Sequence, residues 1–268
     1  MNGNDGIDLI VYINSPTGVT VDLVTGIGSG GTAEGDFLEN IEQIRGSNFD
    51  DRLIGNDNFN SLSGRDGNDT LEAGIGAGLF SGGNGNDLLI GNENQDTLEG
   101  QNGNDTIFGG DGNDFIVGDA NDDVLNGGAG NDTINGGNGV DIITGASLVT
   151  LGVGEIDIIR GDSGADIIKL GTDSTSFYDD GLAGNGTDDY ALIRRYNVTA
   201  DTIELYSGNN YFLGASSVPG RGNGTAIYID SDASGTLDTS VDELIGLLQG
   251  RRLNSGQITA TTQGFTFI

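Results

Sequence analysis

Apolar residues recur at every ninth position between residues 46 and 144. This stretch reads as eleven consecutive nonapeptides with the pattern G-G-x-G-x-D-x-U-x, in which U is a large apolar residue. The positions beside U are mostly polar or small, so each copy predicts a very short strand with one inward side chain. One such strand cannot bury that side chain alone, and the copies are therefore predicted to stack. The eleven apolar residues are Leu53, Leu62, Leu71, Phe80, Leu89, Leu98, Ile107, Ile116, Leu125, Ile134 and Ile143.

The first half of each copy predicts a tight turn that carries an acid. Glycine is frequent there because such turns need positive φ angles. The sixth position is Asp in nine of the eleven copies, and the exceptions are Asn60 and Gly78. Stacking would place like carboxylates about 4.8 Å apart, yet no Lys or Arg occurs between Arg65 and Arg160. A hard divalent cation such as calcium, which binds carboxylate and carbonyl oxygens together, would neutralise them.

These repeats carry a resemblance to a known family. Residues 82–90 (GGNGNDLLI), 109–117 (GGDGNDFIV) and 127–135 (GGAGNDTIN) resemble the nonapeptides of the RTX, or hemolysin-type, calcium-binding repeat proteins. The resemblance implies an all-β fold, a right-handed parallel β-roll with two nonapeptides per coil. It further implies calcium between loops one coil apart, with half of each site from each loop, and about five to nine ions in all.

The resemblance also implies which residues hold the metal. The implied carboxylates belong to Asp51, Asp69, Asp87, Asp105, Asp123 and Asp141 on one edge, Asp96, Asp114 and Asp132 on the other, and Asp157 and Asp166 in two later copies. The implied backbone carbonyls include those of Gly82, Asn84, Gly100, Asn102, Gly109, Asp111, Gly127 and Ala129. Whether calcium occupies the sites next to Asn60 and Gly78 stays open.

Residues 1–45 are predicted to form an opening copy followed by a β insertion. Residues 3–11 repeat the pattern, with Asp8 as a further candidate ligand and Ile10 in the apolar slot. Within the insertion, residues 19–24 alternate like a strand and residues 27–35 are expected to be a flexible turn. Residues 37–44 fit either a strand or a short helix, because a short apolar run does not distinguish the two.

Residues 46–169 are predicted to form the roll, with an interruption at 145–151. Two further copies follow it, at 152–160 and 161–169. We expect the interruption to loop out so that the stack resumes. How Asp132 and Asp141 pair with Asp157 and Asp166 is left open.

Residues 170–268 do not repeat and resemble the β-rich cap that ends RTX regions. An atypical terminal segment is expected, because the open end of a roll must be covered. The family resemblance implies a possible secretion signal here. Strands are predicted at 190–196, 202–206, 211–213, 226–229 and 265–268, and a short helix at 241–248.

Residues 230–238 (DSDASGTLD) resemble an oxygen-ligand calcium loop, with Gly235 at the required sixth position. Val241 stands at the twelfth position, where such loops carry Glu. A calcium site and a plain acidic turn both fit. The candidate ligands are Asp230, Asp232, Ser234 and Asp238.

Composition narrows the function classes. The net charge of -31 and the pI of 4.1 argue against nucleic acid and anionic membranes as partners. The chain has no Cys and no His, so disulfides and the usual zinc ligand and general base are absent. No run of 18 apolar residues predicts a membrane span, and no signal peptide is evident.

An enzyme is not predicted. No G-x-S-x-G motif occurs, and the G-x-G-x-x-G at residues 26–31 lacks the βαβ unit that a dinucleotide site needs. The acids at 179–180 and 188–189 could form a carboxylate pair for glycoside hydrolysis, but solvated loop acids are the simpler interpretation. The third position of the eleven copies holds no Thr, so the ice-binding face of some RTX adhesins is not indicated.

The predicted function is that of a secreted or cell-surface structural module that folds on binding calcium, exported by a type I system. The alternative is the C-terminal RTX part of a larger exported enzyme or adhesin. Surface polysaccharide or another surface protein is a possible partner.

Overall fold

A computed structural model describes residues 1–146, 155–170, 190–194, 201–204, 211–215, 224–229, 243–249 and 265–267. These residues are almost entirely strands and loops, and a 3-10 turn at Gly31–Ala33 is the only helical element in the described part. The chain separates into two compact units, Met1–Leu125 and Asn126–Ile268. Each unit is described in turn.

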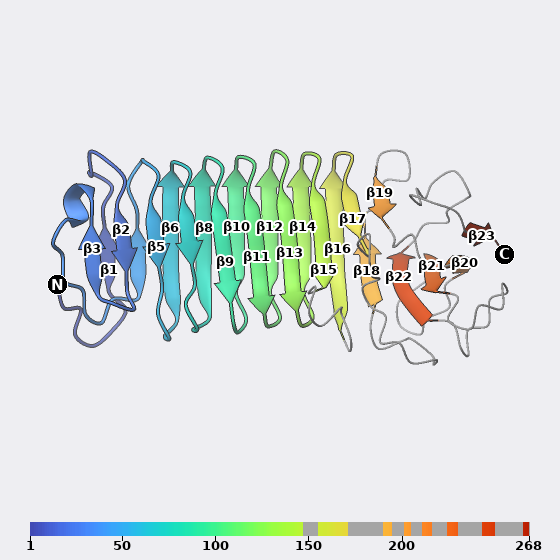
Figure 1. Cartoon of the computed structure of the whole chain (residues 1–268), viewed down its shortest axis with the longest axis horizontal. Coiled ribbons are helices and arrows are strands. Elements are labelled where there is room, and N and C mark those ends of the chain that lie inside the picture. Colours follow the sequence, from blue (N-terminus) through green and yellow to red (C-terminus); the bar gives the residue numbers. More distant parts are fainter. Residues whose placement is uncertain are drawn as a thin grey trace. The chain divides into compact units, whose positions relative to one another are not determined.

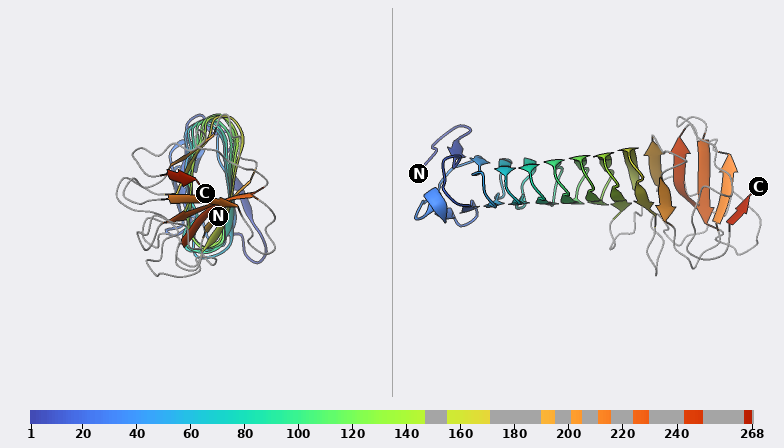
Figure 2. Two further views of the ribbon diagram at one scale, coloured as in Figure 1. Left: turned by 90° about the vertical axis from the view of Figure 1, so that its right-hand side faces the viewer. Right: turned by 90° about the horizontal axis from the view of Figure 1, so that it is seen from above.

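The first unit contains two sheets that face one another (Figures 1 and 2). The first sheet has the order β1 (Leu9–Val11), β4 (Gln43–Arg45), β6 (Asn60–Asp66), β8 (Gly78–Asn84), β10 (Thr97–Asn102) and β12 (Phe115–Ala120). The second sheet has the order β3 (Ile27–Ser29), β2 (Thr20–Asp22), β5 (Arg52–Ile54), β7 (Thr70–Glu72), β9 (Leu88–Asn92) and β11 (Thr106–Asp111).

Successive nonapeptides alternate between the two sheets. Leu62 of β6 therefore pairs with Phe80 of β8, and Leu71 of β7 with Leu89 of β9, each 18 residues later. The repeat strands pair in parallel, as β8 does with β10 and β9 with β11. The predicted parallel β-roll with two nonapeptides per coil is confirmed.

The core of the roll consists of the eighth-position side chains. Each lies at most 5 % exposed, and burying one such side chain stabilises the fold by about 1.5–3 kcal/mol. The neighbouring positions point outward, as Phe108 does at 42 % exposure. The first unit buries Ile10, Ile44, Leu62, Phe80, Leu98 and Ile116 from one sheet and Val21, Leu53, Leu71, Leu89, Ile107 and Leu125 from the other.

The opening segment joins these sheets directly. β1 pairs with β4, and β2 runs parallel to β5, so Ile10 and Val21 occupy eighth-position slots. Residues 37–44 lead into strand β4, and no helix forms there, because Ile44 fills the slot between Ile10 and Leu62. The flexible turn expected at 27–35 was wrong in part. Strand β3 pairs antiparallel with β2, and the 3-10 turn follows it.

The second unit also has two sheets. One has the order β14 (Thr133–Asn138), β16 (Ile156–Ser163), β18 (Tyr190–Arg194), β22 (Glu243–Gln249), β21 (Gly224–Ile229), β20 (Tyr211–Ala215) and β23 (Phe265–Phe267). The other has the order β15 (Ile142–Ala146), β17 (Ile167–Lys169) and β19 (Thr202–Glu204). Strand β13 (Val124–Ala129) spans the boundary between the units.

The stack resumes in register after the interruption. Ile134 pairs with Ile159 and Ile143 with Ile168, so the partner lies 25 residues later instead of 18. The difference equals the seven residues of the interruption. The expectation that the strands would pair as if the interruption were absent is confirmed.

Two predictions about residues 170–268 need correction. The roll pattern does continue past residue 169, because β18 pairs with β16 and β19 with β17, and both Ile193 and Ile203 are fully buried. The helix predicted at 241–248 is strand β22, which pairs with β18 on one side and β21 on the other. A short apolar run suits either state, and neighbouring strands on both sides supply its backbone hydrogen bonds. The five predicted strands correspond to β18, β19, β20, β21 and β23. The division into three segments at 45 and 169 stays a prediction.

No helix in the described part of the chain is long and apolar enough to cross a membrane.

The alternation of buried and exposed positions gives a test in one strand. Ile107→Ala should lower the free energy of unfolding by about 2–5 kcal/mol, since it leaves a cavity in a fully buried site. Phe108→Ala, at the next residue, should cost less than about 1 kcal/mol. Denaturant unfolding in the presence of calcium measures both, and equal losses would contradict the inward assignment of position eight.

Candidate metal centre

Sixth-position aspartates form a hydrogen-bonded ladder along one edge of the first unit. The backbone N–H of Asp51 donates to Oδ1 of Asp69 at 2.7 Å, and the same bond links Asp69 to Asp87 at 2.7 Å. Asp87 and Asp105 continue the ladder through Oδ1 of Asp105 and Asp123, both at 2.8 Å. The structure therefore brings together the loops that the sequence predicted to be neighbours, 18 residues apart.

The opposite edge carries a shorter ladder. Gly78 N–H donates to Oδ1 of Asp96 at 2.7 Å, and Asp96 N–H to Oδ1 of Asp114 at 2.8 Å. At the opening coil, Asp8 N–H donates to Oε2 of Glu42 at 2.9 Å. Glu42 thus occupies a sixth-position slot that sequence reasoning missed, although its spacing of two residues to Ile44 repeats the Asp-x-U signal. Pairings of Asp114 with Asp132 and of Asp123 with Asp141 stay predictions.

Four of the interior aspartates each have one oxygen without a protein partner. Oδ2 of Asp69, Asp87, Asp96 and Asp105 is buried without a hydrogen bond, and these residues are at most 3 % exposed. A buried charged oxygen with no donor or cation is strongly unfavourable. These four oxygens are where a cation would be most stabilising.

The glycine at position one of a loop leaves space for the carboxylate at position six. A Cβ atom added at Gly64 would lie 2.0 Å from Oδ2 of Asp69, and one at Gly82 would lie 2.2 Å from Oδ2 of Asp87. Neither glycine is among the residues with positive φ. The reason for glycine at position one is therefore space for the acid and not backbone conformation.

One copy replaces the carboxylate with apolar atoms. Ala73 is the only first-position residue of the eleven copies that is not glycine, and the same copy has Gly78 at position six. A Cβ at Gly78 would lie 2.2 Å from Cζ of Phe80, so the Phe80 ring occupies the space an acid would need. Ala73 and Phe80 are buried. This loop supplies no carboxylate. That is why the sequence left open whether calcium binds next to Gly78.

In the first two loops of the array, protein donors satisfy the sixth residue. Asp51 accepts hydrogen bonds from Ser47 N–H at 2.6 Å, Ser47 Oγ at 2.8 Å and Val19 N–H at 2.7 Å. Asn60 Oδ1 accepts one from Asn56 N–H at 2.7 Å. Asp51 was predicted as a ligand like the others, but its carboxylate has less need of a cation than those of the interior loops.

In the second unit the acids on the two sides of the interruption pair, which the sequence had left open. Asp132 N–H donates to Oδ1 of Asp157 at 2.8 Å, and Asp141 N–H to Oδ1 of Asp166 at 3.1 Å. Asp166 N–H in turn donates to Oδ1 of Asp201 at 3.2 Å. Asp201 was missed by sequence reasoning, although residues 201–203 (DTI) repeat the letters of residues 132–134.

The predicted carbonyl ligands follow the strands into the turns. Asn84 O accepts a hydrogen bond from Gly67 N–H at 2.9 Å and Asn102 O from Gly85 N–H at 2.8 Å, which leaves each oxygen a second lone pair. The eight residues lie in the second half of their strands: Gly82 and Asn84 in β8, Gly100 and Asn102 in β10, Gly109 and Asp111 in β11, and Gly127 and Ala129 in β13.

The candidate calcium loop at 230–238 lies outside the described residues, as do the acids at 179–180 and 188–189. Among the described residues no three acidic side chains converge on one point. A metal ion bound in the described loops would therefore have few carboxylate ligands, with backbone carbonyls as the others.

Burial changes the acidity of these groups. Loss of solvation raises the pKa of Asp69 to about 8 and those of Asp87 and Asp96 to about 7, and backbone N–H donors offset this only in part. The Asp87 and Asp51 charges raise the pKa of Asp69 further. Desolvation also raises the pKa of Asp114, to about 6, and those of Asp51, Asp105 and Asp166. Without a cation, the folded roll favours protonated carboxyls.

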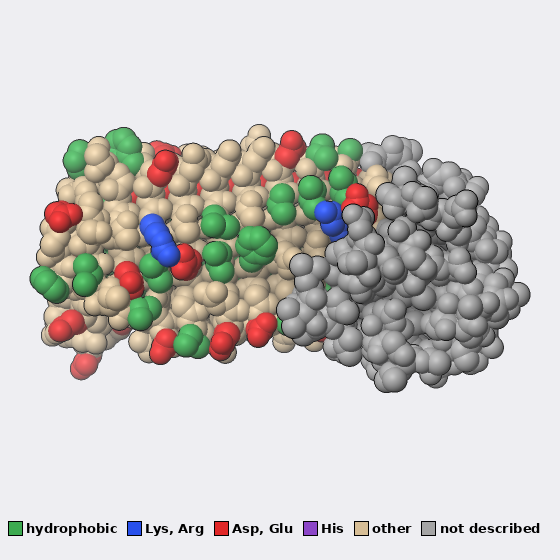
Figure 3. Space-filling model, viewed as in Figure 1, with side chains coloured by type: hydrophobic (Ala, Val, Ile, Leu, Met, Phe, Trp, Pro, Cys, Tyr) green, Lys and Arg blue, Asp and Glu red, His purple; other side chains and the backbone are tan. Residues whose placement is uncertain are grey.

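The donor set fits calcium. The candidate ligands are carboxylate and carbonyl oxygens, and the chain has neither His nor Cys to favour a softer metal. Protein cations are scarce: the face in Figure 3 shows scattered acidic side chains and few Lys or Arg. In the described residues the ion pairs are Arg52–Glu72 at 2.6 Å and Lys169–Glu204 at 3.9 Å, both at the surface.

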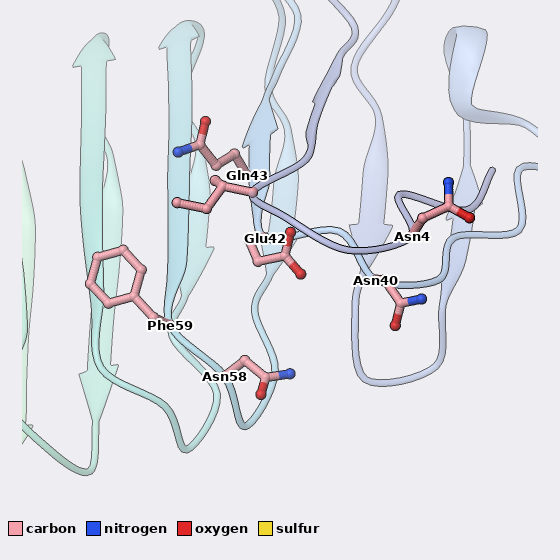
Figure 4. Close-up of a pocket in the computed structure, with 7 residues that line it drawn as sticks. Asn4, Asn40, Glu42, Gln43, Asn58 and Phe59 are labelled. Atoms are coloured by element: carbon pink, nitrogen blue, oxygen red, sulfur yellow. The ribbon is translucent and has the colours of Figure 1, made fainter.

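A surface pocket of about 450 Å³ lies beside Glu42 at the opening coils (Figure 4). Its lining is rich in side-chain amides, whereas the buried ladders consist of aspartate carboxylates. The residues are Asn4, Ile7, Asn40, Glu42, Gln43, Asn58 and Phe59.

Parallel coils with a buried acid in most loops define a β-roll suited to cations, and a comparison with family models gives the class a name. Four copies of the RTX calcium-binding nonapeptide repeat match, at residues 45–80, 81–116, 117–147 and 151–174. No curated protein matches the chain. Residues 45–147 and 151–174 are therefore repeats of the RTX calcium-binding family. Its repeats bind Ca²⁺, and the module is typical of type I secreted proteins and typically non-catalytic.

The contact between positions one and six can be tested by a double-mutant cycle. Gly82→Ala should destabilise the calcium-loaded protein by about 1–3 kcal/mol, because the methyl group overlaps Oδ2 of Asp87. Asp87→Gly removes the overlap, so the double variant should be more stable than the sum of the two single losses, with a coupling of about 0.5–3 kcal/mol. Strictly additive unfolding free energies would show that position one does not seat the acid.

The raised pKa values predict an unusual pH dependence for the metal-free protein. An acid whose folded pKa lies above its unfolded value of about 4 binds its proton more tightly in the folded state. That stabilisation is complete below about pH 4 and is lost as the pH rises through the values of about 7 for Asp87 and 8 for Asp69. Far-UV circular dichroism in metal-free buffer should show more β structure at pH 5 than at pH 8.5. With calcium the trend should reverse, because protons compete with the metal.

Proposed function

We propose that the chain is a secreted or cell-surface structural module whose roll folds when calcium binds. The observation that carries the proposal is the set of buried oxygens without a donor: Oδ2 of Asp69, Asp87, Asp96 and Asp105. No Lys or Arg occurs between Arg65 and Arg160 to neutralise them. A bound cation supplies the missing charge.

The interior loops hold the ions in this proposal. Carboxylates from loops one coil apart act with carbonyls of the same turns, as the family pattern implies. Asp69, Asp87 and Asp105 on one edge and Asp96 and Asp114 on the other are the principal ligands in the first unit. Asp132, Asp141, Asp157 and Asp166 extend the set in the second unit, with Asp201 added by the structure. The predicted number of ions stays at about five to nine.

Several such sites supply enough free energy to decide whether the roll folds. A site at a calcium concentration one hundred times its Kd contributes about 2.7 kcal/mol to folding. Four or more sites together reach the about 5–15 kcal/mol that is the whole stability of an ordinary domain. Without metal, the net charge of -31 and the low apolar content oppose a compact state.

This dependence gives the chain a physical switch. Calcium is scarce inside cells and about millimolar outside them, within the range of extracellular sites. The chain would thus stay unfolded and threadable before type I export and fold after it. The folded product is a stiff module for a cell surface or for an exported assembly.

A calcium titration followed by far-UV circular dichroism tests the proposal. Protein stripped with EDTA should change from a coil to a β spectrum with calcium and not with equal magnesium, since magnesium requires a tighter octahedral site. A fully folded metal-free protein at pH 8, indifferent to calcium, would overturn the calcium-folding proposal.

Matched variants locate the ligands. Asp87→Asn keeps the size and one acceptor oxygen but removes a buried charge, and should raise the calcium midpoint several-fold. Asp57→Asn makes the same charge change at an exposed position of the loop that carries Asn60, and should leave the midpoint near that of the parent. Equal midpoints for the two variants would exclude Asp87 as a ligand.

A further inference from the structure

The outer face of the first sheet carries a polar notch near the ends of β6, β8 and β10, beside the turns that lead to Asp69, Asp87 and Asp105. Arg65 of β6 and Gln101 of β10 both pair with Gly83 of β8, which lies between them. Gly83 has no side chain, so a gap remains between two long ones. Ser63 and Ser81 lie two residues before Arg65 and Gly83 and therefore face the same side of the sheet.

The notch is built mainly from hydrogen-bonding groups. It has a volume of about 280 Å³. Gln101 Nε2 donates to Ser81 Oγ at 2.9 Å, which fixes the amide against the sheet. The lining residues are Ser63, Arg65, Asp66, Ser81, Gly83, Asn84 and Gln101.

Arg65 lacks a partner in this notch. Its Nη1 is buried without a hydrogen bond, and the described residues pair it with no carboxylate. Asp66 lies nearby, but its Oδ1 accepts a hydrogen bond from Asn84 Nδ2 at 2.6 Å. An unsatisfied guanidinium in a chain with 41 acidic residues calls for an acceptor from outside the chain.

We infer that the notch binds the carboxylate of a hydroxylated ligand, such as a uronic acid unit of a saccharide. The guanidinium fork matches a carboxylate in two parallel hydrogen bonds. The Ser63 hydroxyl and the remaining groups of Gln101 are placed to bond neighbouring ligand hydroxyls. This inference concerns a binding partner and does not depend on which loops hold calcium.

The charge of the protein narrows the range of candidate ligands further. The net charge of -31 repels a polyanion at long range, so an isolated carboxylate among neutral sugar units suits the notch better. Arg45, exposed on β4 and paired in register with Ser63, places a second cation on the same sheet face. Arg45 and Arg65 are thus two cations on this face, and Asp66 is the one acid in the lining of the notch.

Ligand-observed NMR with the calcium-loaded chain tests the inference. D-glucuronate should bind, D-glucose should not, and acetate should bind at least several-fold more weakly than glucuronate. Arg65→Gln should weaken the binding of glucuronate at least tenfold. Glutamine already occurs at the matching position of β10, as Gln101. Arg52→Gln makes the same charge change on the other sheet and should leave binding unchanged.

Folding is checked separately by circular dichroism, so a failure here is distinct from a failure of calcium-dependent folding. Ser63→Leu fills the notch without changing charge and provides a second blocking variant if Arg65→Gln does not fold. Equal binding of glucose or of acetate would overturn the assignment. Unchanged affinity in the blocking variants, or absence of glucuronate binding to the folded chain, would overturn it as well.

Discussion

The burial of a carboxylate in most of the loops is the constraint on which the rest of the structure depends. In these loops the acid lies inside the turn, against the glycine five residues earlier, where a Cβ atom would overlap it. That position leaves one oxygen accepting a backbone N–H from the neighbouring coil and the other without a donor. The stack is thereby linked by the acids and at the same time destabilised by their charge, and a cation resolves the conflict.

The loops deal with the unfavourable buried carboxylate in three different ways along the chain. The opening loops satisfy the side chain with protein donors, as Ser47 and Val19 do for Asp51. One loop removes the acid and fills its place with Phe80 and Ala73. The interior loops keep the acid and rely on metal. Calcium dependence is therefore concentrated in particular coils, and the opening end has protein contacts that need no ion.

Register in space, and not spacing in the sequence, sets which acids meet. Asp157 reaches Asp132 although 25 residues separate them, because β16 pairs with β14 as the next coil would. The same rule places Glu42 beside Asp8 across the insertion. A roll tolerates inserted residues in its turns because they need not disturb the strand pairing.

The nonapeptide period by itself determined that short strands stack, which residues form the core and which acids recur, because each copy has one apolar and one acidic position. The roll with two copies per coil followed from the resemblance to the RTX repeats. Only the tertiary structure decided which acids lack a donor, since the Val19 bond to Asp51 comes from an insertion whose course the period does not describe. Glu42, Asp201 and strand β22 escaped the sequence pattern for the same reason. Their neighbours in space, and not their neighbours in sequence, fix their state.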